Sequence, residues 1–98
     1  QQLKVFDAGY KNEISQAKAG ESIIIELKAA LNQDWNKIDK GWVILTDEKG
    51  TNSKVEVVET GANTGIFIAK YHFPELTNTK KLIISYGYFG LGTTINLM

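Results

Sequence analysis

Hydrophobic and polar positions alternate with a period of two along most of the chain. This period is typical of a β-strand that buries one face and leaves the other wetter. In the clearest run, from Ile23 to Leu31, the odd-numbered residues form the apolar face, and Glu26 and Lys28 lie on the wetter one. Further runs of this kind begin near Leu3, Trp42, Lys54, Phe67, Leu82 and Thr93. The pattern therefore predicts about seven strands.

The apolar stripes also predict which side chains form the core. One stripe holds Phe67, Ala69, Tyr71 and Phe73, with Lys70 and His72 on the opposite face; another holds Leu82, Ile84, Tyr86 and Tyr88. Residues typical of turns separate the runs at 19–21, 47–52 and 74–78. Only the segment from Lys11 to Ala19 has helical character, and it is short and weakly amphipathic. We therefore expect an all-β domain, an immunoglobulin-like β-sandwich of about seven strands.

Composition narrows the function classes. The 98 residues suffice for one domain, 1–98, and the chain begins at Gln1 without a Met, so we expect a piece excised from a longer protein. Eleven Lys balance eleven acidic residues, and the absence of Arg argues against nucleic-acid binding. There is no Cys, which excludes disulfides and Cys-based zinc sites. No apolar run approaches the roughly 18 residues of a membrane span, so we expect no membrane insertion.

The stretch Glu59-Thr60-Gly61-Ala62-Asn63-Thr64-Gly65 suggests at first a phosphate-binding loop. Such a loop needs a following helix whose N-terminal amides face the anion. Here the next residues, Ile66 to Phe73, have the pattern of a strand, and no Lys follows the second Gly. The glycines can adopt positive φ, and Asn63 and Thr64 can bond to their own backbone. The stretch is therefore predicted to be a turn between two strands.

With Ile66 and Phe67, this turn resembles the E-T-G-x-N-T-G-x-F signature of immunoglobulin-like repeats in bacterial and archaeal cell-surface, S-layer-like and adhesin-type proteins. The resemblance covers about residues 19–73, and only the signature is specific. It implies a non-catalytic structural or adhesive module, extracellular or at the cell surface, whose partners are neighbouring domains of the same chain or lattice. Those repeats often carry an upstream D-x-D-x-N-x-D stretch. Here Asn32 and Lys37 depart from that pattern.

The same region offers oxygen ligands of the kind that calcium takes. Asn32, Asp34 and Asn36 stand at alternate positions, with Asp39 nearby. Two carboxylates among six to eight ligands would make a weak calcium site, with Asp34 and Asp39 as its charged ligands. The alternative is a polar loop closed by Asx turns. We expect no other cofactor.

Aromatic residues provide the remaining candidate surface. Trp35, Tyr88 and Phe89 are the candidates for a ligand or an interface, and glycines interleave with aromatics from Ser85 to Gly92. If several of these three residues and Trp42 are exposed and coplanar on one face, they indicate a carbohydrate-binding or accessory module attached to a secreted enzyme. The alternative is a final hairpin with Tyr86 and Tyr88 in the core. A third hypothesis is a subunit that holds a partner by strand addition at its sheet edges.

No grouping of residues indicates an enzyme. His72 is the only His, so neither a His-rich zinc site nor a catalytic triad is expected around it. Ser22 and Ser85 lie at a strand start and within a strand, without the pattern of a nucleophile elbow. The adjacent carboxylates Asp47 and Glu48 fall in a turn beside Lys49. We expect no catalytic residue and no enzymatic activity.

Overall fold

The computed structural model describes residues 2–28, 40–61, 64–74, 79–86 and 91–97. Within these ranges the chain forms strands joined by turns, and no helix is present. The prediction of an all-β chain is therefore confirmed. The strands are β1 (Gln2–Asp7), β2 (Gln16–Ala17), β3 (Ser22–Lys28), β4 (Lys40–Asp47), β5 (Asn52–Glu59), β6 (Ile66–His72), β7 (Lys81–Tyr86) and β8 (Leu91–Leu97).

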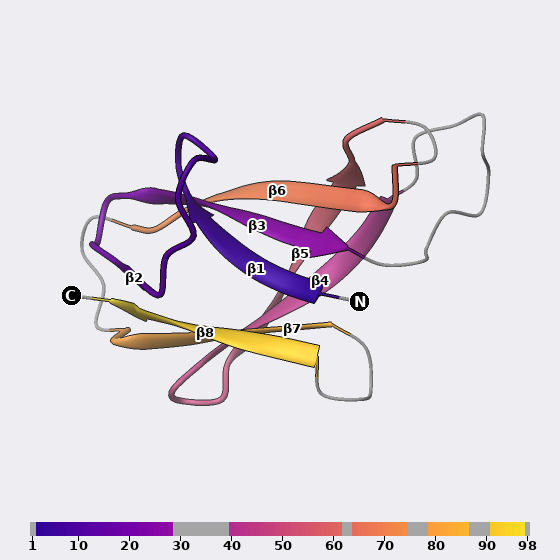
Figure 1. Ribbon diagram of the computed structural model, residues 1–98. Helices are drawn as coiled ribbons and strands as arrows, with labels where there is room; N and C mark the ends of the chain where they lie inside the picture. Colours follow the sequence, from indigo (N-terminus) through magenta and orange to yellow (C-terminus); the bar gives the residue numbers. More distant parts are fainter. Residues whose placement is uncertain (1, 29–39, 62–63, 75–78, 87–90, 98) are drawn as a thin grey trace.

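The strands form one curled, mixed sheet in the order β1-β3-β6-β5-β4-β7-β8-β2. Every pairing is antiparallel except that of β2 with β8. Figure 1 shows β1, β3 and β6 in an upper layer and β7 and β8 in a lower layer, with β4 and β5 crossing behind from one layer to the other. The sheet is therefore continuous through this crossing hairpin.

The eighth strand is the one that the alternation did not predict. The segment from Lys11 to Ala19, which has weak helical character in the sequence, is not helical. Its first part bonds to β1, where the N–H of Ile14 donates to the carbonyl of Val5 at 2.9 Å. Its second part is the two-residue strand β2, which pairs with Asn96 and Leu97 of β8. Pairing on both sides with the backbone of distant strands outweighs the weak helical preference of the segment.

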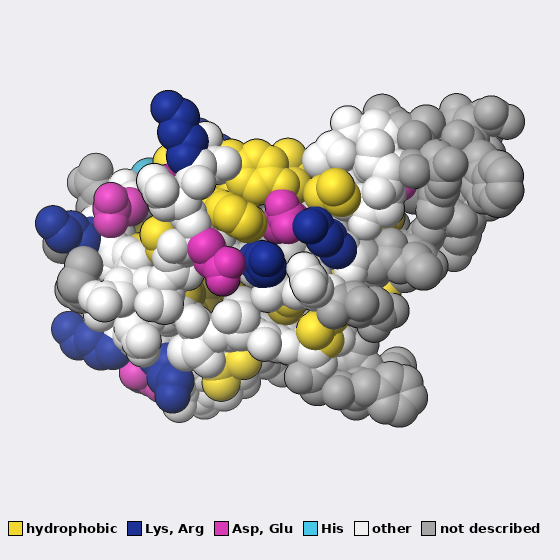
Figure 2. Space-filling model, viewed as in Figure 1, with side chains coloured by type: hydrophobic (Ala, Val, Ile, Leu, Met, Phe, Trp, Pro, Cys, Tyr) yellow, Lys and Arg dark blue, Asp and Glu magenta, His cyan; other side chains and the backbone are white. Residues whose placement is uncertain are grey.

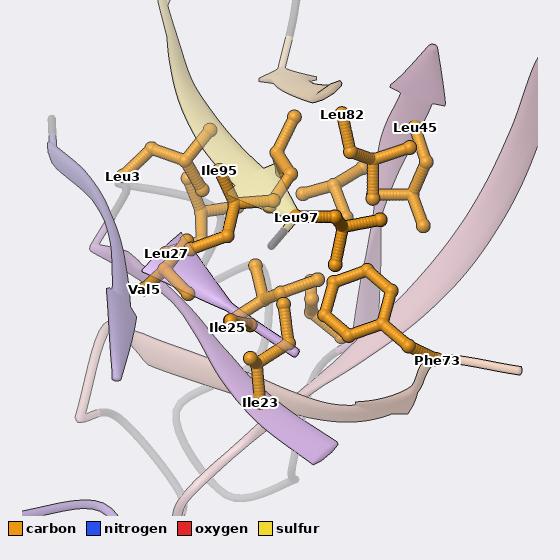
Figure 3. Packing of buried hydrophobic residues seen from close by; sticks show 14 of the residues in the cluster. Leu3, Val5, Ile23, Ile25, Leu27, Leu45, Phe73, Leu82, Ile95 and Leu97 are labelled. Carbon is orange, nitrogen blue, oxygen red and sulfur yellow. The ribbon is translucent and has the colours of Figure 1, made fainter. Parts of the chain in front are cut away.

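The core lies between the two layers and collects the predicted apolar stripes. Ile23, Ile25 and Leu27 of β3 are fully buried, as are Phe67 of β6 and Ile84 of β7. Figure 3 shows side chains of both layers pointing toward one another, among them Leu3, Leu27 and Ile95 at one place and Leu45, Leu82 and Leu97 at another. Tyr71 and Phe73 meet edge to face, with ring centroids 5.2 Å apart. The inward stripes predicted for the β3, β6 and β7 segments are thus confirmed within the described residues.

The outward face of β3 differs from its prediction as the wetter face. Ile24 and Glu26 both lie on it and both are buried, whereas Lys28 is exposed. The connection after β1 lies close to this face, since the ring of Tyr10 packs edge to face on Phe6, which pairs with Ile24. The hydroxyl of Tyr10 donates a hydrogen bond to Glu26. A polar and an apolar residue are thus buried on the same outward face.

Candidate functional site

The residues predicted to bind calcium lie outside the described part of the chain. These are Asn32, Asp34, Asn36 and Asp39, all within 29–39. The aromatic candidates Trp35, Tyr88 and Phe89 also lie outside it. Among the residues that the structure does describe, no three His, Cys, Asp or Glu side chains are grouped as metal ligands. The calcium and aromatic hypotheses therefore stay predictions.

The signature stretch joins β5 to β6 by a turn that its own side chains close. The carboxylate of Glu59, which is only 3% exposed, accepts the N–H of Gly65 at 2.8 Å. The N–H of Thr60 donates to the carbonyl of Ile66 at 2.8 Å, and the hydroxyl of Thr64 lies 3.0 Å from that of Thr60. Gly65 has φ 69°, which only Gly adopts without strain. The predicted turn is confirmed, and a strand follows it.

Gly61 plays a different part from Gly65. It lies outside the left-handed region, and a Cβ there would meet the methyl group of Thr64 at 3.4 Å, an ordinary contact. Of the two glycines, only Gly65 is required by its backbone conformation. Sequence reasoning expected a positive φ or a close backbone neighbour at Gly61 or Gly65 and favoured both; this expectation is confirmed for Gly65 and wrong for Gly61.

Carboxylates hold other turns in the same way. Asp47 accepts the N–H groups of Lys49 and Thr51, each at 2.9 Å, which closes the β4–β5 hairpin. Glu48 accepts the N–H of Lys80 at 3.0 Å from another part of the chain. The adjacent pair Asp47 and Glu48, predicted to lie in a turn, is engaged in organising the backbone. These two carboxylates therefore stabilise backbone turns and contacts.

Asp7 anchors the turn after β1. Its carboxylate accepts the N–H of Lys11 at 2.9 Å and the side-chain amide of Asn12 at 3.0 Å. The Lys11 hydrogen bond, followed by that of Asn12, lowers the pKa of Asp7 from its ordinary value because both favour the charged form. The turn that follows contains Tyr10, whose φ of 59° is unusual for a residue with a side chain.

The Tyr10 hydroxyl, which is hydrogen-bonded to Glu26, has the largest pKa shift in the described part of the molecule. Partial desolvation of Tyr10, which stays 39% exposed, followed by the hydrogen bond to Glu26 and the negative charge of Glu26, raises the pKa of the Tyr10 hydroxyl to about 12. Glu26 stands between Lys4 of β1 and Ile68 of β6 in the sheet. Sequence reasoning missed this pair, because the alternation placed Glu26 on a wet face. Two aromatic rings near the end of β1, at Phe6 and Tyr10, were the available signal that this face is covered.

Ser22 and His72 are the nearest approach to a catalytic arrangement. They face each other across β3 and β6, and the Ser22 hydroxyl lies 2.9 Å from Nδ1 of His72. A triad needs, in addition, an acid that orients the imidazole. Within the described part of the chain, the side-chain hydrogen bond of His72 is to Ser22 and not to a carboxylate. The pair is an exposed cross-strand contact, and His72 lies on the wetter face, as predicted.

Two cavities open on the described surface. One of about 150 Å³ lies where β5 and β6 diverge, with Ser53 on one side and Tyr71 and Phe73 on the other. The second, of about 370 Å³, lies between the end of β1, β2 and the start of β3 and is lined by Asp7, Gln16 and Glu21 among others. Neither combines a nucleophile with a base and an orienting acid.

Trp42 is the exposed aromatic residue of the β4–β5 hairpin. Its side chain is 53% exposed on the outward face of β4, directly opposite Glu56 of β5. Nζ of Lys40 lies 3.9 Å from Oε1 of Glu56, so an ion pair borders the indole. Figure 2, viewed from the side on which β1, β3 and β8 lie in front of β4 and β5, shows hydrophobic side chains on the surface next to Lys and acidic groups.

The comparisons with known proteins add no relative. No protein-family model, curated protein or solved structure matches the chain. Within the described residues, no helix is both long and apolar enough to cross a membrane.

Proposed function

We propose that the chain is an immunoglobulin-like module with a structural, non-catalytic role in a secreted or cell-surface protein. The strand order supports the fold. If the two-residue β2 is set aside, the seven longer strands are A to G in chain order, and the sheet order becomes A-B-E-D-C-F-G. Immunoglobulin constant-type domains place A, B, E and D in one sheet and C, F and G in the other. The signature from Glu59 to Phe67 adds the resemblance to surface repeats.

The position of the two chain ends is the observation that carries the proposed role. Figure 1 places the start of β1 and the end of β8 on opposite sides of the molecule. A tension applied to these ends pulls β1 and β8 along their own axes. The hydrogen bonds of an antiparallel pair are perpendicular to the strands, so such a tension loads all of them together. Each terminal strand is held by six register pairs, β1 against β3 and β8 against β7. This arrangement suits a spacer that bears load.

Force spectroscopy with two pulling directions tests this role. The chain contains no Cys, so engineered cysteines give unique attachment points. Handles at Gln2→Cys and Asn96→Cys load the terminal strands in shear. Handles at Lys49→Cys and Asn96→Cys pull from the same end of the sheet, since Asp47 pairs with Leu82 and Leu82 with Ile95, and peel β8 from β7.

We expect a clearly higher unfolding force in the shear direction at the same loading rate. Equal forces in the two directions would contradict a load-bearing role. Labelling of intact cells with an antibody against the domain tests the surface location separately, and labelling that requires permeabilised cells would contradict it.

Trp42 favours a second candidate, a carbohydrate-binding or accessory module. An indole 53% exposed beside the Lys40–Glu56 ion pair provides a stacking face with hydrogen-bonding groups at its edge. Binding to an oligosaccharide array that Trp42→Ala abolishes, while Ile83→Ala at another exposed apolar position retains it, would support this function. Absence of binding to any glycan would leave the structural role alone.

A further inference from the structure

The edge of β5 that faces β6 is paired over only part of its length. Among the described strands, β6 pairs with β5 at Val58 and Glu59 alone, and the two strands then diverge across the 150 Å³ cavity. On its other side, β5 pairs with β4 from Asn52 to Val58. Of the residues before Val57, only Val55 is even half-buried. The first part of β5 is therefore an exposed sheet edge, the kind of surface that pairs with another strand.

The register of the hairpin identifies the backbone groups on this edge. The N–H of Asp47 donates to the carbonyl of Thr51 at 3.1 Å, and bonded and non-bonded pairs alternate along an antiparallel ladder. Ser53, Val55 and Val57 thus bond to β4. Asn52, Lys54 and Glu56 direct their N–H and C=O groups to the opposite edge. The bond from the N–H of Thr60 to Ile66 at 2.8 Å, on the β6 side, agrees with this parity.

We propose that this edge pairs with the same edge of a second copy, antiparallel and centred on Val55. In this register Lys54 of each copy faces Glu56 of the other, and both residues present backbone groups to the edge. Two-fold symmetry makes this oppositely charged pair occur twice. A register centred on Lys54 would place the two ammonium groups opposite each other, which is unfavourable. Charge complementarity therefore selects both the partner and the register.

The outward side of the new pairing carries charges that the domain already exposes. Lys54 is exposed, and Glu56 has a side chain 40% accessible in its contact with Lys40. Pairing only a few residues on each side buries less than the roughly 1,200 Å² of a standard interface, so the dimer dissociates on dilution. It forms whether or not the domain bears load, so its failure would leave the spacer role untouched.

Charge reversal tests the register. Sedimentation velocity of the whole chain over a wide concentration range gives the dimer dissociation constant. Lys54→Glu and Glu56→Lys each place like charges opposite each other twice, and we expect each to raise the constant by about tenfold or more. The double variant Lys54→Glu, Glu56→Lys restores opposite charges and should return it to within about threefold of the parent value. Lys81→Glu on β7 changes the net charge as Lys54→Glu does, and as the matched control it should leave the dimer dissociation constant unchanged. Circular dichroism checks that each variant folds.

Three results would overturn the proposal. The first is a parent chain that stays monomeric up to about 1 mM, because weaker association would not support a specific strand register. The second is a Lys81→Glu variant that weakens association as much as Lys54→Glu. The third is a double variant that associates no better than the single ones.

Discussion

Tyr10 combines a left-handed backbone conformation with a hydrogen bond to a buried carboxylate. Its φ of 59° directs the ring toward Phe6, and its hydroxyl reaches Glu26 on the neighbouring strand. The Asp7 carboxylate holds the same turn by accepting the N–H of Lys11. Single side chains thus fix the connection after β1 upon the outward face of the sheet, where the alternation of the sequence predicts only solvent.

The raised pKa of Tyr10 predicts a loss of stability in alkali. The pKa rises from 10.0 to about 12 on folding, so the folded chain favours the neutral hydroxyl. The stabilisation is complete below pH 10 and is lost as the pH rises from 10 to about 12. Titration of the phenolate absorbance should show an ionisation step near pH 12 that belongs to Tyr10. Tyr10→Phe should remove this late step and flatten the alkaline limb of the unfolding curve. A titration in which Tyr10→Phe removes no ionisation step above pH 10 would refute the assignment.

At the scale of elements, the turn between β5 and β6 follows most directly from the sequence. Its turn residues and the strand patterns on both sides predicted a strand–turn–strand unit, which is confirmed. The sequence did not show that the Glu59 carboxylate would be buried and accept the N–H of Gly65. Glu59 lies on the same face of β5 as the buried Val57, so its burial follows from the packing of the sheet and not from the turn residues alone. Local spacing therefore predicts the element, while its anchoring depends on tertiary packing.

The two glycines of this turn should respond differently to substitution. Gly65→Ala places a side chain in the left-handed region, which costs about 1–2 kcal/mol of unfolding free energy. Gly61→Ala is the matched control: it meets only a methyl group at 3.4 Å, and the reduced freedom of the unfolded chain favours it by up to about 1 kcal/mol. Urea denaturation measures both. Equal destabilisation by the two substitutions would contradict the distinction.

At the scale of the whole molecule, the sequence predicted the strands and their inward faces better than their assembly. Ile23, Ile25 and Leu27 follow the period of two and are fully buried. The alternation does not predict that the β4–β5 hairpin crosses between the layers, because strand order depends on long-range pairing. It does not predict β2 either, because two residues are too few to show alternation. The predicted calcium ligands and the aromatic candidates fall outside the described residues, so these two predictions rest on the sequence alone.

The core between the layers should dominate stability. Ile25→Ala leaves a cavity among fully buried side chains and should lower the free energy of unfolding by about 2–5 kcal/mol. Ile83→Ala removes the same atoms from a side chain that is 42% exposed on the outward face of β7, and should cost less than about 1 kcal/mol. Chemical denaturation compares the two. Similar losses for both variants would mean that the inward and outward faces are assigned wrongly.

The pairing of β2 with β8 has a consequence for the order of events during synthesis. Ala17 pairs with Leu97, so the sheet joins a strand near the beginning of the chain to the last described residues. Such long sequence separations give a high contact order, and proteins dominated by non-local pairing fold slowly, in milliseconds to seconds. The local β4–β5 hairpin can form as soon as its residues are available. β2 cannot pair with the edge of β8 until Leu97 has left the ribosome, so translation through β8 precedes completion of this sheet.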